Sequence, residues 1–288
     1  MKRQNLFAVL AVAFGLTASF SSCTNQDSVG TDASLTATAT DEAQASNVSD
    51  QIVSTADEYV NNFEANGYQQ ISAAQKVSAV STVDSVIITI DKTGLTVFPK
   101  KMCIDFGTTG FTDKRGNVLK GKIYLTISAK MSIAGSSRKF EFSNFYINDN
   151  ALKGSKTVTY NGETSGKPSW TIVAKDTILR ADGTTVIWNS ERVRTRTDNN
   201  STPLIYWDDT YSITGSSNGV NAKGVAYSMV IDDAKPLVII KDWKYFVSGS
   251  VVITTEKRTA VLDYGDGTKD AKATLTINGV TKEITLRK

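Results

Sequence analysis

Three carboxylates beside two tryptophans form the clearest chemical arrangement in this 288-residue chain. Glu191, Asp208 and Asp209 lie close in sequence to Trp188 and Trp207. A glycoside hydrolase uses two such carboxylates, one as an acid and one as a base or nucleophile. Asp and Glu near strand ends are more often turn or surface residues, and no recognisable catalytic pattern surrounds these three. A hydrolase that uses Glu191 with Asp208 or Asp209 is therefore kept only as an alternative.

A second group of residues has the chemistry of a binding site. Three arginines alternate along one predicted strand and therefore share one face, which suits phosphate or sulfate groups on glycans or lipopolysaccharide. A solvated outer face is the alternative. Tryptophans offer stacking surfaces for sugars, although aromatic residues on strands more often fill a core. The residues expected to contact a ligand are Trp188, Trp207, Arg192, Arg194 and Arg196.

A glycine-rich turn near the C-terminus carries the only candidate metal ligands. Asp263, Asp266 and Asp270 would offer oxygens to calcium, but their spacing matches no EF-hand loop. A plain hairpin turn is the alternative. We expect no other cofactor.

The chain contains no histidine, and this excludes several chemistries. Neither a Ser-His-Asp nor a Cys-His pair can be built, and a His-ligated zinc or iron site is equally excluded. Cys103 would need another base to act as a nucleophile. Because free cysteine is among the most buried residue types, we expect Cys103 in the core. An enzyme is therefore not expected.

The charge of the chain argues against nucleic acid as a partner. The sequence has 32 Lys and Arg against 29 Asp and Glu. Removing residues 1–22 leaves 30 against 29, close to neutral. Nucleic-acid binding needs a concentrated basic surface instead.

The N-terminus predicts export and a lipid anchor. Lys2 and Arg3 precede an uncharged apolar run, too short to span a bilayer, so residues 1–22 are predicted to be a signal peptide. The segment Phe20-Ser21-Ser22-Cys23 resembles the lipobox of bacterial lipoproteins, in which cleavage exposes a cysteine that receives acyl chains such as palmitate. Acyl chains on Cys23 would hold the chain on a membrane without a transmembrane helix.

Composition and periodicity divide the rest of the chain into three parts. Residues 23–47 are rich in Ser, Thr, Ala and Asp, which predicts a flexible tether. Apolar residues at spacings of three and four then predict one short amphipathic helix within a helical segment over residues 48–82. Residues 83–288 alternate apolar and polar side chains between turn residues, which predicts an antiparallel β-domain. A change of phase near Asn144 predicts a β-bulge.

The fold class expected is therefore all-β, mainly an antiparallel meander, a sandwich or a curved, half-barrel sheet, with one short N-terminal helix. The sequence does not distinguish a sheet that closes into a barrel from a sandwich or an open meander. A third possible role is that of an assembly subunit, which donates or accepts strands at a sheet edge.

The lipobox and two stretches of the β-region together resemble uncharacterised cell-envelope lipoproteins of Bacteroidota. The two stretches begin at Asp105-Phe106-Gly107 and at Asp263-Tyr264-Gly265. This resemblance implies a cell-envelope location, at the outer membrane, on either its periplasmic or its surface side, and it brings no catalytic residues. Taken together, these features of the sequence favour a non-enzymatic envelope lipoprotein with a binding or structural role. Its partner would be a glycan, an envelope polymer or another protein.

Overall fold

The structure is a computed structural model that describes residues 26–65, 75–77, 86–91, 96–198 and 209–287. The side chains of residues 26–32 and 75–77 lie outside the description. The described chain forms one long helix, α1 (Gln26–Ala65), and a single 16-stranded sheet.

Every strand pairing in the sheet is antiparallel, as the alternating sequence predicts. The main path follows the chain as a meander, β1-β2-β3-β5-β6-β7-β8-β9-β10-β11-β13-β14-β15-β16, with β4 beside β5 and β12 beside β10 and β13. The strands are β1 (Gln75–Val77), β2 (Val86–Ile90), β3 (Lys100–Asp105), β4 (Phe111–Thr112), β5 (Val118–Ile127), β6 (Ser137–Ile147), β7 (Asn150–Thr164), β8 (Lys167–Leu179), β9 (Thr185–Arg196), β10 (Thr210–Val220), β11 (Ala226–Ile231), β12 (Leu237–Ile240), β13 (Ser248–Thr255), β14 (Thr259–Asp266), β15 (Lys272–Ile277) and β16 (Val280–Thr285).

The predicted bulge at Asn144 is confirmed. The register of β6 against β7 shifts between Glu141 and Phe145, and Asn144 has a positive φ of 47°. The neighbouring strand β5 needs a glycine at the same place, because a Cβ on Gly121 would lie 1.9 Å from the Asn144 carbonyl oxygen. Only glycine fits there, and the extra residue turns the following side chains of β6 back to the inner face.

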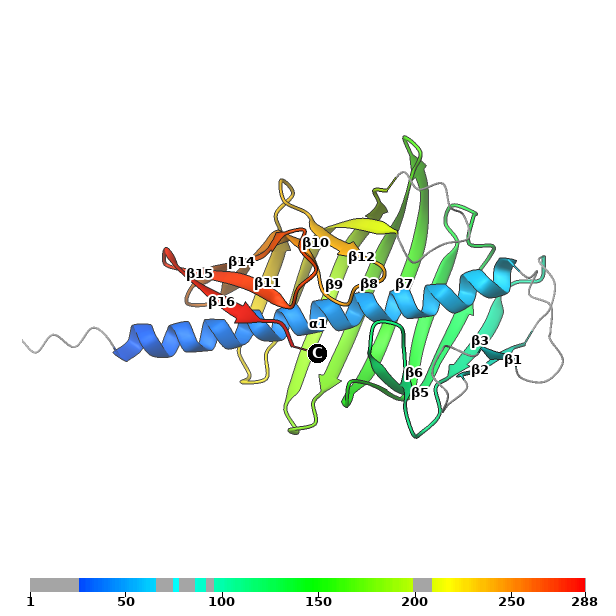
Figure 1. Cartoon of the computed structure of the whole chain (residues 1–288), viewed down its shortest axis with the longest axis horizontal. Helices are drawn as coiled ribbons and strands as arrows, with labels where there is room; N and C mark the ends of the chain where they lie inside the picture. The colour runs from blue at the N-terminus through cyan, green and yellow to red at the C-terminus, as the bar shows by residue number, and fades with distance from the viewer. Residues whose placement is uncertain (1–25, 66–74, 78–85, 92–95, 199–208, 288) are drawn as a thin grey trace, which may run out of the picture.

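Helix α1 lies along the inner face of the curved sheet (Figure 1). The middle strands β5–β9 lie on one side of it, and the C-terminal strands β14–β16 lie beside its N-terminal half. Small side chains allow this close approach: Ala39 and Ala56 are completely buried. The helix is therefore the central element of the fold.

The predicted tether over residues 23–47 is wrong from Gln26 onward, because those residues belong to α1. The predicted short helix is equally wrong in length, since α1 has 40 residues and ends at Ala65. From Leu35 onward most of its polar side chains are buried along with the apolar ones. Such a segment looks unable to fold on its own, but here the sheet supplies partners for its polar groups.

Opposite charges join the helix to the sheet. Eight acidic residues and no Lys or Arg occur in α1, at Asp27, Asp32, Asp41, Glu42, Asp50, Asp57, Glu58 and Glu64. Ion pairs with the sheet and its turns follow the helix axis, among them Asp41 with Arg180 at 2.6 Å, Glu42 with Arg192 at 3.2 Å, Asp50 with Arg194 at 3.6 Å, and Asp57 with Arg138 at 2.8 Å.

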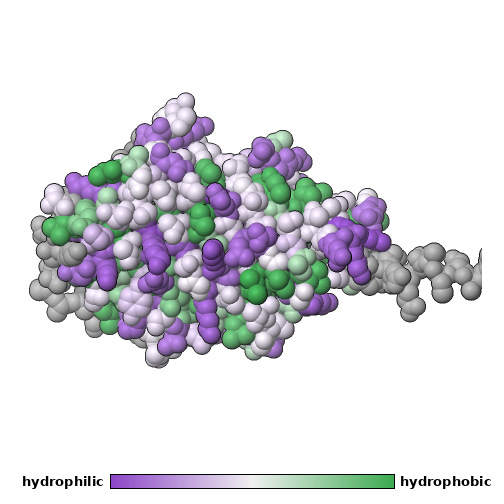
Figure 2. Space-filling view, turned by 180° about the vertical axis from the view of Figure 1, so that it is seen from behind, coloured by the Kyte–Doolittle hydropathy of each residue, from purple (hydrophilic) through white to green (hydrophobic). Residues whose placement is uncertain are grey.

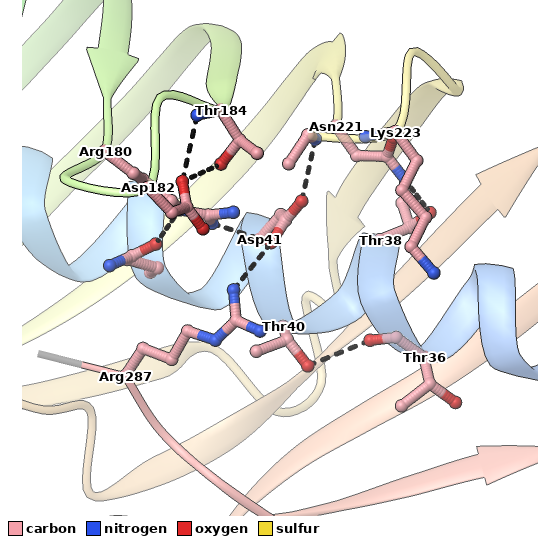
Figure 3. Close-up of polar contacts among 12 residues, drawn as sticks. Thr36, Thr38, Thr40, Asp41, Arg180, Asp182, Thr184, Asn221, Lys223 and Arg287 are labelled. Carbon is pink, nitrogen blue, oxygen red and sulfur yellow. Dashed lines mark hydrogen bonds and ion pairs between the residues drawn. The ribbon is translucent and has the colours of Figure 1, made fainter.

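Asp41 joins three segments that are far apart in the sequence (Figure 3). Its carboxylate accepts hydrogen bonds from Arg180 after β8, from the backbone N–H of Ala222 after β10, and from Arg287 after β16. One helical turn earlier, the Thr38 hydroxyl accepts a bond from Asn221. The N-terminal half of α1 thereby ties the middle of the sheet to its last strand.

Glu42 is the most completely enclosed carboxylate of this interface. It accepts hydrogen bonds from Trp188 Nε1 at 2.8 Å, from Ser217 Oγ at 3.0 Å and from Arg192 Nη2 at 3.2 Å. Burial raises the pKa of Glu42, while Arg192 and the hydrogen-bond donors lower it. Such a buried charge is stable only while its partners are present.

The outer face of the sheet is mixed in character. Figure 2 shows hydrophilic residues interspersed with single hydrophobic ones on the side seen from behind. No helix among the described residues is long and apolar enough to cross a membrane.

We expect Glu42→Ala to lower the free energy of unfolding by about 3–5 kcal/mol, because it leaves the buried Arg192 without a counter-charge. The double variant Glu42→Gln/Arg192→Met should recover most of that loss, since no charge is left unpaired and the amide oxygen can still accept from Trp188 and Ser217. Urea unfolding measures the free energy of unfolding of the wild-type protein and of both variants. A double variant as unstable as the single one would show that the charge pair is not what stabilises this part of the helix.

Candidate functional site

A cavity of about 400 Å³ lies between the C-terminal half of α1 and strands β6–β10. The helix contributes Asp57, Asn61 and Glu64 to its wall, and the loop between β5 and β6 contributes Met131 and Ser132. This volume falls within the range of small-molecule sites, roughly 300–1,000 Å³. The cavity is therefore the candidate binding site.

Aromatic rings line the sheet side of the cavity. Tyr160 of β7 is the cross-strand partner of Trp170 of β8, and their ring centroids are 5.6 Å apart. Tyr211 of β10 meets Trp170 edge to face at 6.0 Å. Tyr160 and Tyr211 are almost fully buried, whereas Trp170 is only partly buried. The Trp170 ring thus offers a flat apolar surface that its two neighbours hold in place.

Three arginines meet at the same cavity. Arg194 is the cross-strand neighbour of Trp170, and its guanidinium lies 3.7 Å from the centroid of the Tyr211 ring. Arg138 enters from β6, and Arg196 lies at the end of β9. Arg138 and Arg194 are only 3% and 2% exposed, while the Arg196 side chain is 31% exposed. The site combines a deep cationic wall with a more accessible arginine at its edge.

The carboxylates of the cavity have partners within the protein. Asp57 is ion-paired with Arg138 at 2.8 Å. Both oxygens of Glu64 lie within hydrogen-bond distance of the Met131 backbone N–H, at 3.0 and 3.2 Å. Asp209 accepts a bond of 2.8 Å from the Tyr211 hydroxyl, and burial raises the pKa of Asp209. These contacts orient the acidic groups as hydrogen-bond acceptors along the wall.

Lys241, which follows β12, is a buried cation in this cavity. Its side chain is 2% exposed, and burial lowers its pKa to about 8, an effect that the nearby Asp57 carboxylate opposes. Arg194 adds to the lowering, and Asp209 opposes it. A change of one proton on the cavity wall is therefore expected close to pH 8.

The structure separates the five residues expected to contact a ligand. Arg194 and Arg196 line the cavity, but Trp188 and Arg192 do not, because both donate to the buried Glu42. The prediction for Trp188 and Arg192 as ligand contacts is therefore wrong. Trp207 lies outside the described residues.

The carboxylates of the alternative hydrolase are not brought together. Glu191 is exposed on the outer face of β9, whereas Asp209 is buried in the cavity on the inner face. Asp208 lies outside the described residues. A pair of Glu191 with Asp209 cannot flank one substrate, because the sheet stands between them.

The three aspartates of the C-terminal turn have separate local roles. Asp263, Asp266 and Asp270 each accept a backbone N–H two residues further on, from Gly265, Thr268 and Lys272. Throughout the described residues, no group of three His, Cys, Asp or Glu is arranged to hold a metal ion. The calcium hypothesis has no support in this geometry, and the plain hairpin turn fits it.

Cys103 is not a core residue, which corrects another prediction. It lies on β3 between the buried Met102 and Ile104, so its side chain points to the opposite, outer face and is only partly buried. Burial raises the pKa of the Cys103 thiol. Alternation along β3 was the signal that would have placed it correctly.

Sequence reasoning missed Arg138, Tyr160, Asp57 and Lys241 as residues of the site. Arg138 is two residues before the buried Phe140, so alternation alone puts it on the inner face. Asp57 gave no such signal, because its partner Arg138 is 81 positions away in the sequence.

Comparison of the chain with protein-family models, with curated proteins and with solved structures finds no match. The site must therefore be interpreted from its own geometry.

The buried Lys241 gives a pH-dependent prediction. In the folded protein it loses its proton near pH 8, and in the unfolded chain near pH ~10.4. The unfolded state therefore binds more protons between these values, and the free energy of unfolding rises with pH, by at most about 1.4 kcal/mol per unit.

Urea unfolding of the protein and of Lys241→Met between pH 7 and 10 measures this contribution. The difference between the two curves should be flat below pH 8 and should rise in favour of the protein above it. Parallel curves across the whole range would show that Lys241 keeps an ordinary pKa.

Proposed function

We propose that this protein is a non-enzymatic, lipid-anchored saccharide-binding protein of the cell envelope. The cavity beside Trp170 is the site, and the observation that carries the proposal is the row of Tyr160, Trp170 and Tyr211 rings in its wall. A sugar ring has an apolar C–H face, which suits a flat aromatic surface, and a rim of hydroxyl groups, which needs both donors and acceptors.

The polar groups around the rings meet that second requirement. Arg138 and Arg196 supply N–H donors, whereas Asp57 and Asp209 supply carboxylate oxygens. A cavity lined by aromatic rings and a small number of fixed polar groups is the usual form of a small-molecule site. A purely structural role would not explain why these groups surround open volume.

Binding without turnover fits the state of the two buried carboxylates. A glycoside hydrolase needs one carboxyl free to protonate the leaving group and another to act as base or nucleophile. Asp57 is held by Arg138, and Asp209 accepts the hydroxyl of Tyr211. Both carboxylates are therefore engaged in positioning the wall of the cavity.

The anchor proposed is Cys23 in the lipobox-like segment, and the location is the envelope, at the outer membrane. Cys23 precedes the first residue of α1, Gln26, by three positions. A lipid there would attach directly to the central helix of the fold.

Binding is tested first with a glycan array, followed by titration calorimetry on the full chain purified in detergent. Trp170→Ala should weaken the binding of a retained saccharide at least tenfold, or about 1.4 kcal/mol, because the stacking surface is lost. Trp243→Ala is the matched control, since Trp243 lies outside the cavity, and it should bind normally. Retention of no saccharide would overturn the proposed function, and release of a shortened saccharide would favour the hydrolase instead.

Lipid attachment is tested by growing the source cells with labelled palmitate. The protein should carry the label and pellet with membranes, and Cys23→Ser should do neither. Cys103→Ser serves as the control, because it removes the other cysteine of the chain and should leave labelling unchanged. A labelled Cys23→Ser protein would rule out this anchor.

A further inference from the structure

The arginines of the cavity have donors that nothing in the described structure accepts. Nε of Arg138, Nε and Nη1 of Arg194, and Nε of Arg196 are buried and lack a hydrogen-bond partner. Buried polar groups in folded proteins are paired in the great majority of cases, and each exception calls for an explanation. Four such nitrogens belong to the arginines of one cavity, and an acceptor brought by a ligand would satisfy them.

The carboxylates near these arginines satisfy them incompletely. Arg194 Nη1 is 3.6 Å from Asp50 Oδ1, and Arg196 Nε is 3.5 Å from Asp198 Oδ1, both beyond a good charge-assisted hydrogen bond of about 2.7–2.9 Å. Asp57 is closer to Arg138, at 2.8 Å, but its Oδ1 and Nε of Arg138 are among the atoms without a hydrogen bond. The electrostatic attraction is present, whereas the directional bonds are not.

Two arginines outside the cavity make more hydrogen bonds with the helix. Arg180, outside it, donates to Gln44 at 2.8 Å and to Asp41 at 2.6 Å. Arg192 donates to Ser46 at 2.5 Å and to Glu42 at 3.2 Å, although its Nε is unpaired. Inside the cavity, Arg194 donates to the helix through one longer bond, from Nη2 to Ser54 Oγ at 3.3 Å, although Arg138 lies 2.8 Å from Asp57.

Resting on the proposed function, we propose that the bound saccharide carries an oxyanion, either a carboxylate or a sulfate, which Arg138, Arg194 and Arg196 recognise. Guanidinium groups bind pairs of oxyanion oxygens, on planar carboxylates or on tetrahedral groups such as sulfate, through parallel N–H bonds. Arg194 lies beside Trp170 in one cross-strand row, so a ring stacked on Trp170 directs its acidic substituent toward this arginine. The Tyr211 ring below the guanidinium fixes its orientation.

The test compares matched acidic and neutral ligands by calorimetry with the full chain. Galacturonate oligomers are set against their methyl esters, and dextran sulfate is set against dextran. At least one acidic ligand should bind ten times more tightly than its neutral partner, and the preference should shrink as salt rises. The ligand pair that shows it distinguishes a carboxylate from a sulfate.

Arg196→Gln should reduce that preference at least threefold without unfolding the protein, because the Arg196 side chain is partly exposed. Lys139→Gln removes a positive charge from the exposed outer face, and the preference should stay unchanged. The comparison of acidic with neutral ligands on the wild-type protein needs no variant. It therefore does not depend on whether Arg196→Gln and Lys139→Gln fold.

Equal binding of acidic and neutral ligands, with Trp170→Ala still harmful, would overturn this inference and leave the proposed function intact. An acidic preference that Arg196→Gln leaves unchanged would also overturn it. So would a preference that Lys139→Gln reduces as much as Arg196→Gln does, because a general charge effect would then explain it. If no saccharide binds at all, both proposals fail.

Discussion

The attraction between an acidic helix and a basic sheet is the interaction on which the rest of this structure depends. Helix α1 has no positive side chain, and the sheet and its turns place Arg180, Arg192, Arg194 and Arg138 opposite its acids. Burying any one of these charges alone would cost several kcal/mol. Because each charge needs its partner in place, the pairs fix the position of the helix along the sheet as well as its presence there.

The cavity lies where this pairing becomes incomplete. Toward the N-terminal half of α1, Asp41 and Glu42 are each bonded to several donors. Toward the C-terminal half, the helix and the strands enclose about 400 Å³ of open volume beside Asp57 and the arginines. One interface thus stabilises the fold at one end and provides a candidate binding surface at the other, where the Tyr211 ring of β10 lies against the Arg194 guanidinium.

Features that depend on neighbouring residues in the sequence could be predicted, whereas features that depend on contacts between distant residues could not. Strands such as β5 and β9 depend on local alternation, and the bulge at Asn144 left a change of phase that is visible in the sequence. Residues 26–47 were misjudged because Ser, Thr and Ala carry no local sign of burial, and the partners of Glu42 are 146 to 175 positions away. Two of the three cavity arginines, Arg194 and Arg196, were predictable from one strand, whereas Asp57 and Lys241 join the site only through tertiary packing.

The position of α1 in the sequence has a consequence for the order of folding. The helix precedes the whole sheet in the sequence, and Arg287, which bonds to Asp41, lies 246 positions after it. A solitary acidic helix is only marginally stable in water, and contacts of such large sequence separation form slowly. The sheet can therefore assemble around the full length of the helix only after the segment that carries Arg287 has been made.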